Sequence, residues 1–204
     1  MKTTNLWQFH AHKNNIMKKI HLKIFLMITI VINFIACKAQ TLPLNTFMEN
    51  IPNNAYVKDL NNELAPYVGI YKSNYQGNEI TLYITKEENR ITKRVNKQFY
   101  RDALVIKYIV KNSSGVVLQD TQNVNIPHIR LYSIRTMPQQ NKINFVYSGT
   151  NCRVGWGDID LSKISPTQIK WDYMPDSMLT DRCPPGTDIN IYLPITKGLI
   201  FTKQ

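Results

Sequence analysis

The sequence has little cysteine and little histidine, and both shortages exclude classes of protein. Its 204 residues include three Cys and four His. Three cysteines are too few for a disulfide-dense scaffold. Three histidines fall within the first 21 residues, which leaves too few for a histidine-rich metal centre. Glycine-rich phosphate loops, Cys-x-x-Cys pairs and Gly-x-Ser-x-Gly elbows are also missing. We therefore predict no catalytic residue, no metal and no cofactor.

Long apolar runs are scarce as well. Residues 24–36 are apolar except for Thr29 and Asn33, and they follow the basic segment Lys18–Lys23. Thirteen residues rise about 20 Å as a helix, which is shorter than the ~30 Å hydrocarbon core that a membrane span must cross. A basic segment before a short apolar run is typical of a secretory signal.

The junction after this run, Phe34-Ile35-Ala36-Cys37, resembles the signal of bacterial lipoproteins, with Phe34 where leucine is usual. The resemblance implies cleavage before Cys37 and attachment of lipid to its sulfur. Several acyl chains together anchor a protein stably, whereas one does not. The alternative is an ordinary signal peptide that ends beside an incidental cysteine.

The signal divides the chain into four predicted parts. Residues 1–16 are an over-extended start before Met17, 17–36 are the signal peptide, 37–55 are a flexible tether and 56–204 are a β domain. Removal of residues 1–36 takes away five lysines and no acid, so the formal charge falls from +11 to +6. In proteins with a similar signal, an Asp at position 38 would resemble an inner-membrane retention signal, so Lys38 favours the outer membrane. An acidic stretch after Cys37 would resemble a signal for surface export, so its lack favours the periplasmic leaflet.

Two cysteines remain once Cys37 carries lipid. Cys152 and Cys183 are 31 residues apart, and an oxidising envelope favours their pairing. Such a bond would stabilise the fold by roughly 3–4 kcal/mol in the chain-entropy model. The alternative is a pair of buried thiols.

Apolar residues alternate with polar residues from Tyr67 onwards. This period of two predicts strands that each bury one face. The apolar rows are Ile80, Leu82 and Ile84; Leu104, Ile106, Tyr108 and Val110; Ile143, Phe145 and Tyr147; and Ile169, Trp171 and Tyr173. Turn sequences separate them at 75–78, 112–115, 165–167 and 184–186.

These rows predict an all-β fold. We expect about ten short strands in a single antiparallel barrel or sandwich, with a calycin-like barrel as one form. The run 199–202 would close the sheet. Val57, Leu60 and Leu64 have helical spacing before Pro66, which predicts a short helix over 56–65.

Three stretches resemble an uncharacterised family of small flavobacterial lipoproteins, known as a domain of unknown function. The first stretch is 37–40 (Cys-Lys-Ala-Gln). The second is 59–71, which is followed by Gly77-Asn78 as in relatives. The third is Pro194 together with 199–204. The resemblance implies a family and no activity. The chain is also similar to lipocalins at the level of fold, in which a helix and a Gly-x-Trp motif precede an antiparallel meander. Here Gly69 is followed by Tyr71 where the tryptophan would be. The alternative is that Gly69 is a close-packing glycine in an ordinary first strand.

One expected hairpin gathers carboxylates and tryptophans. Asp158 and Asp160 would share a strand face, and Asp172 would lie opposite them across the 165–167 turn. Trp156 and Trp171 fall in the same hairpin. Clustered carboxylates can bind Ca²⁺ through their oxygens or carry out glycosidase acid–base chemistry, and aromatic rings beside them are common in carbohydrate sites. The alternative is a charged hairpin face with the tryptophans in the core.

A basic stretch surrounds a second expected strand pair. It comprises Lys86, Arg90, Lys93, Arg94, Lys97 and Arg101. In an exported protein this pattern favours anionic glycan or lipid headgroups over nucleic acid as partners. A solvated strand surface is the alternative. His128, behind Pro127, is interpreted as a loop residue, and we expect no catalytic role for it or for Cys152.

Together these observations predict an envelope protein held to the membrane by its N-terminal lipid. The leading hypothesis is a non-catalytic module that binds a small apolar or glycan ligand. The alternatives are a structural protein that holds an envelope partner and a cryptic carbohydrate hydrolase. A deep apolar cavity would favour the first, a flat apolar patch the second, and two carboxylates about 5–10 Å apart in a cleft the third.

Overall fold

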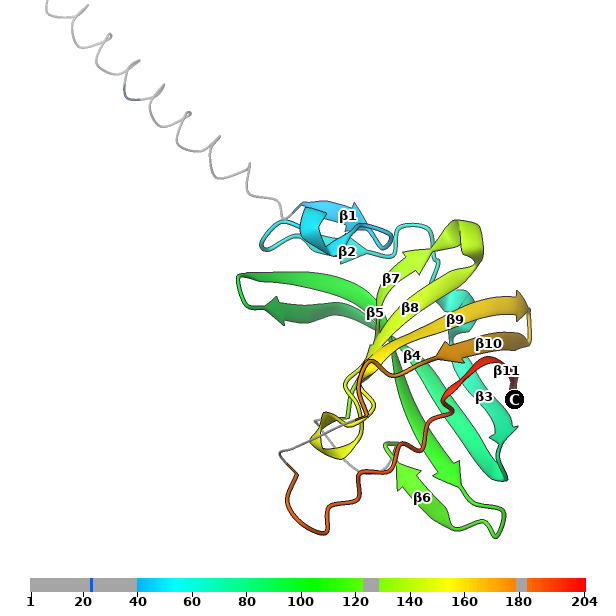
Figure 1. Ribbon diagram of the computed structural model, residues 1–204. Helices are drawn as coiled ribbons and strands as arrows, with labels where there is room; N and C mark the ends of the chain where they lie inside the picture. The colour runs from blue at the N-terminus through cyan, green and yellow to red at the C-terminus, as the bar shows by residue number, and fades with distance from the viewer. Residues whose placement is uncertain (1–22, 24–39, 123–128, 179–182) are drawn as a thin grey trace, which may run out of the picture. The chain divides into compact units, whose positions relative to one another are not determined.

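The computed structural model describes Lys23 and residues 40–122, 129–178 and 183–204. Residues Gln40–Gln204 form one structural unit, built almost entirely from β-strands (Figure 1). The strands are β1 (Thr41–Pro43), β2 (Tyr56–Lys58), β3 (Gly69–Tyr75), β4 (Asn78–Arg94), β5 (Lys97–Lys111), β6 (Val117–Asp120), β7 (Leu131–Met137), β8 (Lys142–Tyr147), β9 (Gly157–Ser165), β10 (Gln168–Tyr173) and β11 (Thr196–Lys203). Short 3₁₀ turns are η1 (Met48–Asn50), η2 (Ala65–Tyr67), η3 (Pro138–Gln140) and η4 (Asn151–Arg153). Of the described residues, none belongs to a helix with the length and apolar character of a membrane span.

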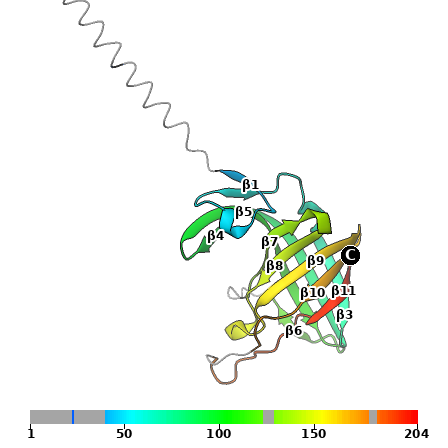
Figure 2. The ribbon, with the colours of Figure 1, turned by 45° about the horizontal axis from the view of Figure 1, so that its top comes forward.

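Eight of these strands form a closed up-and-down barrel (Figure 2). The strands β3, β4, β5, β7, β8, β9, β10 and β11 follow one another around it, each antiparallel to the next, and β11 returns to β3. The circle closes between β5 and β7, where Val105 pairs with Tyr132 and the backbone N–H of Leu104 donates to Ser133 Oγ at 2.8 Å. The predicted all-β fold is confirmed, in the barrel form.

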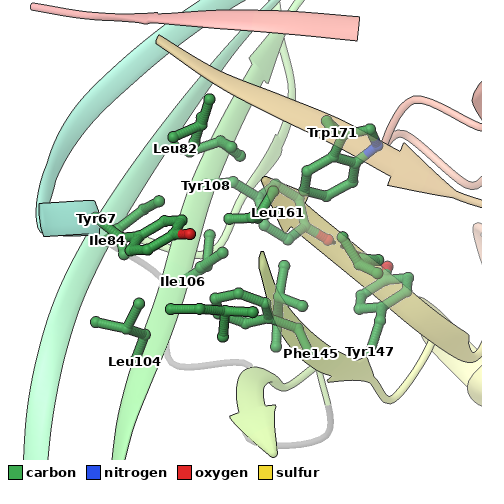
Figure 3. Close-up of a cluster of buried hydrophobic side chains, with 14 of the residues drawn as sticks. Tyr67, Leu82, Ile84, Leu104, Ile106, Tyr108, Phe145, Tyr147, Leu161 and Trp171 are labelled. Carbon is green, nitrogen blue, oxygen red and sulfur yellow. Dashed lines mark hydrogen bonds between the residues drawn. The ribbon is translucent and has the colours of Figure 1, made fainter. Parts of the chain in front are cut away.

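The predicted apolar rows point into this barrel. Side chains from β4 and β5 meet side chains from β8, β9 and β10 in its interior (Figure 3). Leu82, Tyr108, Phe145 and Trp171 are all fully buried there. An eight-stranded barrel is just wide enough for its own side chains to fill it or to hold one small ligand. Large aromatic residues fill this one.

Strands β4 and β5 continue past the barrel as a two-stranded arm, made of residues 90–94 and 97–101 (Figure 1). The register shifts between Glu87 and Arg90, and Asn89 between them has a φ of 53°. Such a bulge bends the strand that carries it. The two long strands therefore serve the barrel at one end and a separate small sheet at the other.

This small sheet joins the arm to the beginning of the unit. β2 runs parallel to β5, and β1 runs parallel to β2. In consequence Thr41, Tyr56, Tyr100 and Ile91 form one row of register partners across four strands.

The helix predicted over 56–65 is absent, so this prediction is wrong. Residues Tyr56–Lys58 are a strand, and Leu60 is 55% exposed although the helical pattern required it to be buried. The Asp59 carboxylate instead accepts the backbone N–H of Glu63 at 2.7 Å, which closes a turn. Pairing with β1 and this local hydrogen bond outweigh the helical spacing.

The tether predicted over 37–55 is corrected for its described part, residues 40–55. These residues belong to the same unit as the barrel. Leu44, Ile51 and Ala55 are each at most 3% exposed and pack in the main hydrophobic core. Their apolar side chains stand singly among polar residues, so no periodic pattern marked them. The folded domain therefore begins near Gln40 and not at residue 56.

The first barrel strand opens with Gly69 and Tyr71. A Cβ on Gly69 would lie 2.5 Å from Cε of the flexible Lys203 side chain, and the φ of 147° at Gly69 is one that other residues rarely adopt. Lys203 donates from Nζ to the Val68 carbonyl at 2.7 Å, and its Nζ lies 5.8 Å from the centre of the Tyr71 ring. Tyr71 itself is fully buried. The close-packing interpretation of Gly69 accounts for this geometry.

Candidate binding site

The expected carboxylate hairpin forms with the expected register. Asp160 on β9 lies directly opposite Asp172 on β10, and Asp158 is two residues away on the same strand face. Lysines engage two of these groups: Lys142 Nζ lies 2.9 Å from Asp160 and Lys170 Nζ lies 3.3 Å from Asp172. The three aspartates thus lie on the outside of the barrel, in a sheet face with interspersed cations.

The structure does not bring Trp171 to these aspartates. Trp171 is fully buried inside the barrel, and its indole N–H donates to the Pro194 carbonyl at 2.9 Å. Its side chain therefore lies on the opposite sheet face from Asp172, its neighbour in the strand. Trp156 is 39% exposed and forms an isolated bridge with Ser177. The interpretation of Trp171 as a core residue is the one that fits.

The pKa of Asp158 is raised by burial and by the nearby Asp176 carboxylate, although a hydrogen bond from Asn144 opposes the shift. A raised carboxyl pKa is one requirement of a general acid. The partner carboxylate, Asp160, is however held by Lys142 and by Asn144 Nδ2 at 3.0 Å. Within the described part of the chain, no group of three or more His, Cys, Asp or Glu side chains is placed to hold a metal ion.

Tyrosines fill the barrel centre and bond to one another (Figure 3). The Tyr108 hydroxyl donates to Gln119 Oε1 at 2.6 Å and lies 3.2 Å from the Tyr147 hydroxyl. Gln119 Nε2 in turn donates to Thr150 Oγ1 at 3.2 Å. Burial raises the pKa of Tyr147 to about 12 and that of Tyr108 well above its ordinary value. The hydroxyl groups of Tyr108 and Tyr147 are thus satisfied within the protein.

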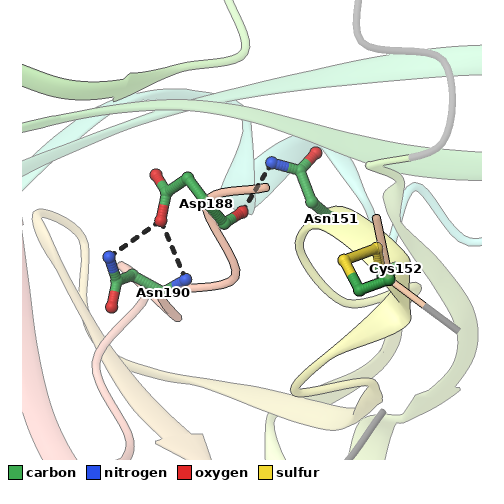
Figure 4. The surroundings of a disulfide bond; sticks show 5 residues. Asn151, Cys152, Asp188 and Asn190 are labelled. Atoms are coloured by element: carbon green, nitrogen blue, oxygen red, sulfur yellow. Dashed lines mark hydrogen bonds between the residues drawn. A yellow bond between two sulfur atoms is a disulfide. The ribbon is translucent and has the colours of Figure 1, made fainter. Parts of the chain in front are cut away.

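A disulfide joins Cys152 and Cys183, with their Cα atoms 5.6 Å apart (Figure 4). This confirms the predicted pair. Beside it, Asn151 Nδ2 donates to the Asp188 carbonyl at 2.7 Å, and the Asp188 carboxylate accepts the backbone N–H of Asn190 at 3.0 Å. The bond removes Cys152 as a nucleophile. Cys37 and His128 lie outside the described residues.

A small cavity of about 200 Å³ lies where η2 crosses the end of the barrel. It is lined by residues that include Glu63, Tyr67, Thr136 and Lys163. Both signs of charge are present, so the lining selects no ligand charge.

Three cationic side chains line a groove between the arm and β7. The groove has a volume of about 360 Å³, and its lining residues are Arg90, Ile91, Thr92, Lys93, Arg130 and Tyr132. The Arg90 guanidinium stacks on the Tyr132 ring, 4.7 Å from its centre, and pairs with Glu87 at 2.5 Å. Stacking holds the Arg90 side chain in place at the groove. We name this feature the basic groove.

A buried arginine lies beside the basic groove. Arg101 is directly opposite Arg90 in the register of β4 and β5, and it is only 3% exposed. Its Nη1 donates to the Ile134 carbonyl, while its Nε and Nη2 have no hydrogen-bond partner among the described residues. Burial lowers the pKa of Arg101 to about 10; the proximity of Arg94 adds to this effect and Tyr132 opposes it. A buried guanidinium without a carboxylate partner is costly.

A model of a family of unknown function matches residues 17–204. The chain belongs to the DUF6705 family. No curated protein and no solved structure matches it. The predicted membership of a family of unknown function is confirmed, and the DUF6705 match includes both the domain and the segment interpreted as a signal peptide.

In this DUF6705 chain, the predicted basic stretch divides between the basic groove and structural roles. Arg90 and Lys93 line the groove. Lys86 pairs with Asp59 at 3.2 Å, and Lys97 donates to the Ile51 carbonyl at 3.0 Å, so these two cations secure the arm. Sequence reasoning missed Arg130 and Tyr132, because they are about forty residues from Arg90 and reach it only through the β5–β7 closure.

Proposed function

We propose that this DUF6705 chain is a lipid-anchored envelope protein whose barrel is a non-catalytic binding module. The anchor is the lipid on Cys37, in the periplasmic leaflet of the outer membrane, and the ligand is an anion held in the basic groove. The Cys152–Cys183 disulfide supports export, because such bonds persist in oxidising compartments. The basic and apolar stretches of residues 17–36, directly before Cys37, support the interpretation as a lipoprotein signal.

The basic groove is the observation that carries the binding role. Arg90, Lys93 and Arg130 line one space, and Arg101, which has no salt bridge among the described residues, lies directly opposite Arg90 in the sheet. Charge-assisted hydrogen bonds from such groups to an anion are about twice as strong as neutral ones. Arginines and a lysine bind and orient an anion through their N–H donors, which favours a binding role.

The barrel interior is filled by side chains, which favours a binding site on the surface over one inside the barrel. Tyr108 and Tyr147 occupy the centre, where a carrier of the calycin type would hold its ligand. The surface carboxylates Asp160 and Asp172 are each engaged by a lysine. The carbohydrate-hydrolase alternative therefore has less support than an anion-binding surface.

Mass spectrometry of the protein from its own membrane tests the proposal. The peptide that begins at Cys37 should carry the mass of attached acyl chains, and a Cys37→Ala variant should lose both this mass and the membrane association. The native spectrum should show an anionic ligand, which an Arg130→Gln variant releases. Unmodified Cys37 would contradict the anchoring. A tightly bound protein partner in place of a small anion would favour the structural alternative.

A further inference from the structure

The basic groove lies close, along the sheet, to the point where the chain leaves the domain towards Cys37. Thr41 on β1 and Ile91 in the groove belong to the same four-strand row. Neighbouring strands are about 4.8 Å apart, so three steps place the two backbones about 14 Å apart. The groove is therefore near the N-terminal edge of the domain.

Covalent geometry limits how far Cys37 can be from this row. The four steps from Cys37 to Thr41 span at most about 14 Å when fully extended. A lipid on Cys37 would thus keep the backbone of Ile91 within about 28 Å of the anchor. With residues 40–55 packed in the domain, no long tether separates the arm from the membrane.

The arm itself carries the side chains of a surface that meets anionic lipid. Val95 at its tip is fully exposed, and Ile91 is 48% exposed. Lys93 and Arg94 lie between them in the sequence. Apolar residues that enter the headgroup region beside cations that contact its charge are typical of peripheral membrane surfaces.

We propose that the basic groove binds a phosphate group, and that the headgroup of an anionic membrane lipid beside the anchor supplies it. The choice of lipid as the source rests on the proposed anchoring at Cys37. The phosphate chemistry rests on the groove alone. Guanidinium groups match phosphate through paired N–H donors, and the groove presents Arg90 and Arg130 together with Lys93. The charge of Arg101 adds to the potential that an anion meets there.

The test uses the full chain, purified from its membrane in nonionic detergent and titrated calorimetrically with inorganic phosphate. Arg130→Gln should weaken phosphate binding about tenfold, because one charge-assisted contact is lost. Lys170→Gln is the matched control: it also removes one positive charge, from β10, which lies four strands from β5 in either direction around the barrel. This control should bind phosphate within about twofold of the wild type. Sodium chloride at about 1 M should weaken the wild type, because it shortens the Debye length to ~3 Å.

A second titration identifies the source of the phosphate. Micelles doped with phosphatidylglycerol should compete for the groove, whereas micelles doped with zwitterionic phosphatidylcholine should not. Competition by neither lipid, with phosphate still bound, would retain the phosphate site and overturn the membrane source. Absence of phosphate binding, or equal weakening by Arg130→Gln and Lys170→Gln, would overturn the phosphate site. The mass of the Cys37 peptide is measured on the same sample, so a failure of the anchoring is seen separately.

Discussion

Arg90 and Arg101 lie directly opposite each other on β4 and β5, so two guanidinium groups share one face of the arm. Like charges in such a cross-strand pair destabilise a sheet. Arg90 is compensated by Glu87 and by the Tyr132 ring. Arg101 is buried, its hydrogen-bond partner is the Ile134 carbonyl, and its guanidinium carbon lies 5.5 Å from the centre of the Phe99 ring. The pair therefore lowers the stability of the arm, and unfavourable pairs of this kind are typical of functional sites.

Arg101→Met should therefore raise the free energy of unfolding, by about 1–3 kcal/mol, because a buried unpaired charge is replaced by an apolar chain of similar length. The same variant should bind phosphate more weakly. Urea unfolding followed by fluorescence measures the first effect, and calorimetry the second. Arg90→Met is the control, since it removes a partly exposed charge that already has partners, and its stability should change by less than about 1 kcal/mol. A clear loss of stability in Arg101→Met would show that the guanidinium is a structural group.

Asp102→Asn should destabilise the junction between the arm and the barrel by about 1–3 kcal/mol. The Asp102 carboxylate accepts hydrogen bonds from the Tyr56 hydroxyl and from the backbone N–H groups of Asp59 and Asn89. An amide group cannot accept all of them. The matched control is Asp172→Asn, because Asp172 accepts one backbone N–H on the outer face of the barrel.

The pH dependence of stability provides a second measurement on the same variant. Burial alone would raise the pKa of Asp102, but the hydrogen bonds from Tyr56 and the two backbone N–H groups, with the nearby Lys86, lower it below its ordinary value. A depressed folded-state pKa contributes stability above the unfolded pKa of about 3.9, and this stability is lost as the pH falls through the folded-state value. The wild type should lose this contribution on acidification. If Asp102→Asn lost as much stability on acidification as the wild type, the role assigned to the Asp102 hydrogen bonds would be contradicted.

The sequence predicts the barrel well because its strands bury one face each. The alternation of Ile80, Leu82 and Ile84 shows which face of the strand is buried, because a shift of one residue would expose all three side chains. The same argument places Asp160 opposite Asp172 across a short turn. Local alternation and turn chemistry were sufficient for these elements.

The arm and the basic groove depend on contacts that no local pattern reports. The bulge at Glu87–Arg90 adds residues to one strand without any break in its composition. Arg130 joins Arg90 only because β7 closes the barrel against β5. Leu44 is buried through packing against distant strands. Such tertiary contacts cannot be predicted from the periodicity of the sequence.

The disulfide should contribute about 3–4 kcal/mol, because it closes a loop between residues 31 apart. A Cys152→Ser, Cys183→Ser double variant should unfold at correspondingly lower urea concentration than the wild type. Treatment with dithiothreitol should lower the stability of the wild type to that of the double variant and leave the double variant unchanged. Equal stability of the reduced and oxidised wild type would contradict this contribution.

The two tryptophans of the β9–β10 hairpin should respond differently to the same change. Trp171→Phe removes the donor to the Pro194 carbonyl and leaves a void in the barrel, so a loss of about 2–4 kcal/mol is expected. Trp156→Phe changes a side chain that is 39% exposed and should cost less than about 1 kcal/mol. Chemical unfolding monitored by circular dichroism compares the pair. Similar losses in both would contradict the placement of Trp171 in the core.

Alkaline pH should unfold the barrel through its buried tyrosines. Burial raises the pKa of Tyr67 and that of Tyr147 to about 12 in the folded protein, whereas unfolded phenols ionise near ~10. Between these two values the folded state holds more protons than the unfolded state, so its stability is complete below about pH 10 and falls as the pH rises towards about 12. Phenolate absorbance should show the exposed tyrosines ionising first and the buried ones only with unfolding. Tyr147→Phe should weaken the pH dependence in this window, although it also removes a hydrogen bond to Tyr108. Simultaneous ionisation of all tyrosines near pH ~10, with the fold intact, would contradict a filled barrel.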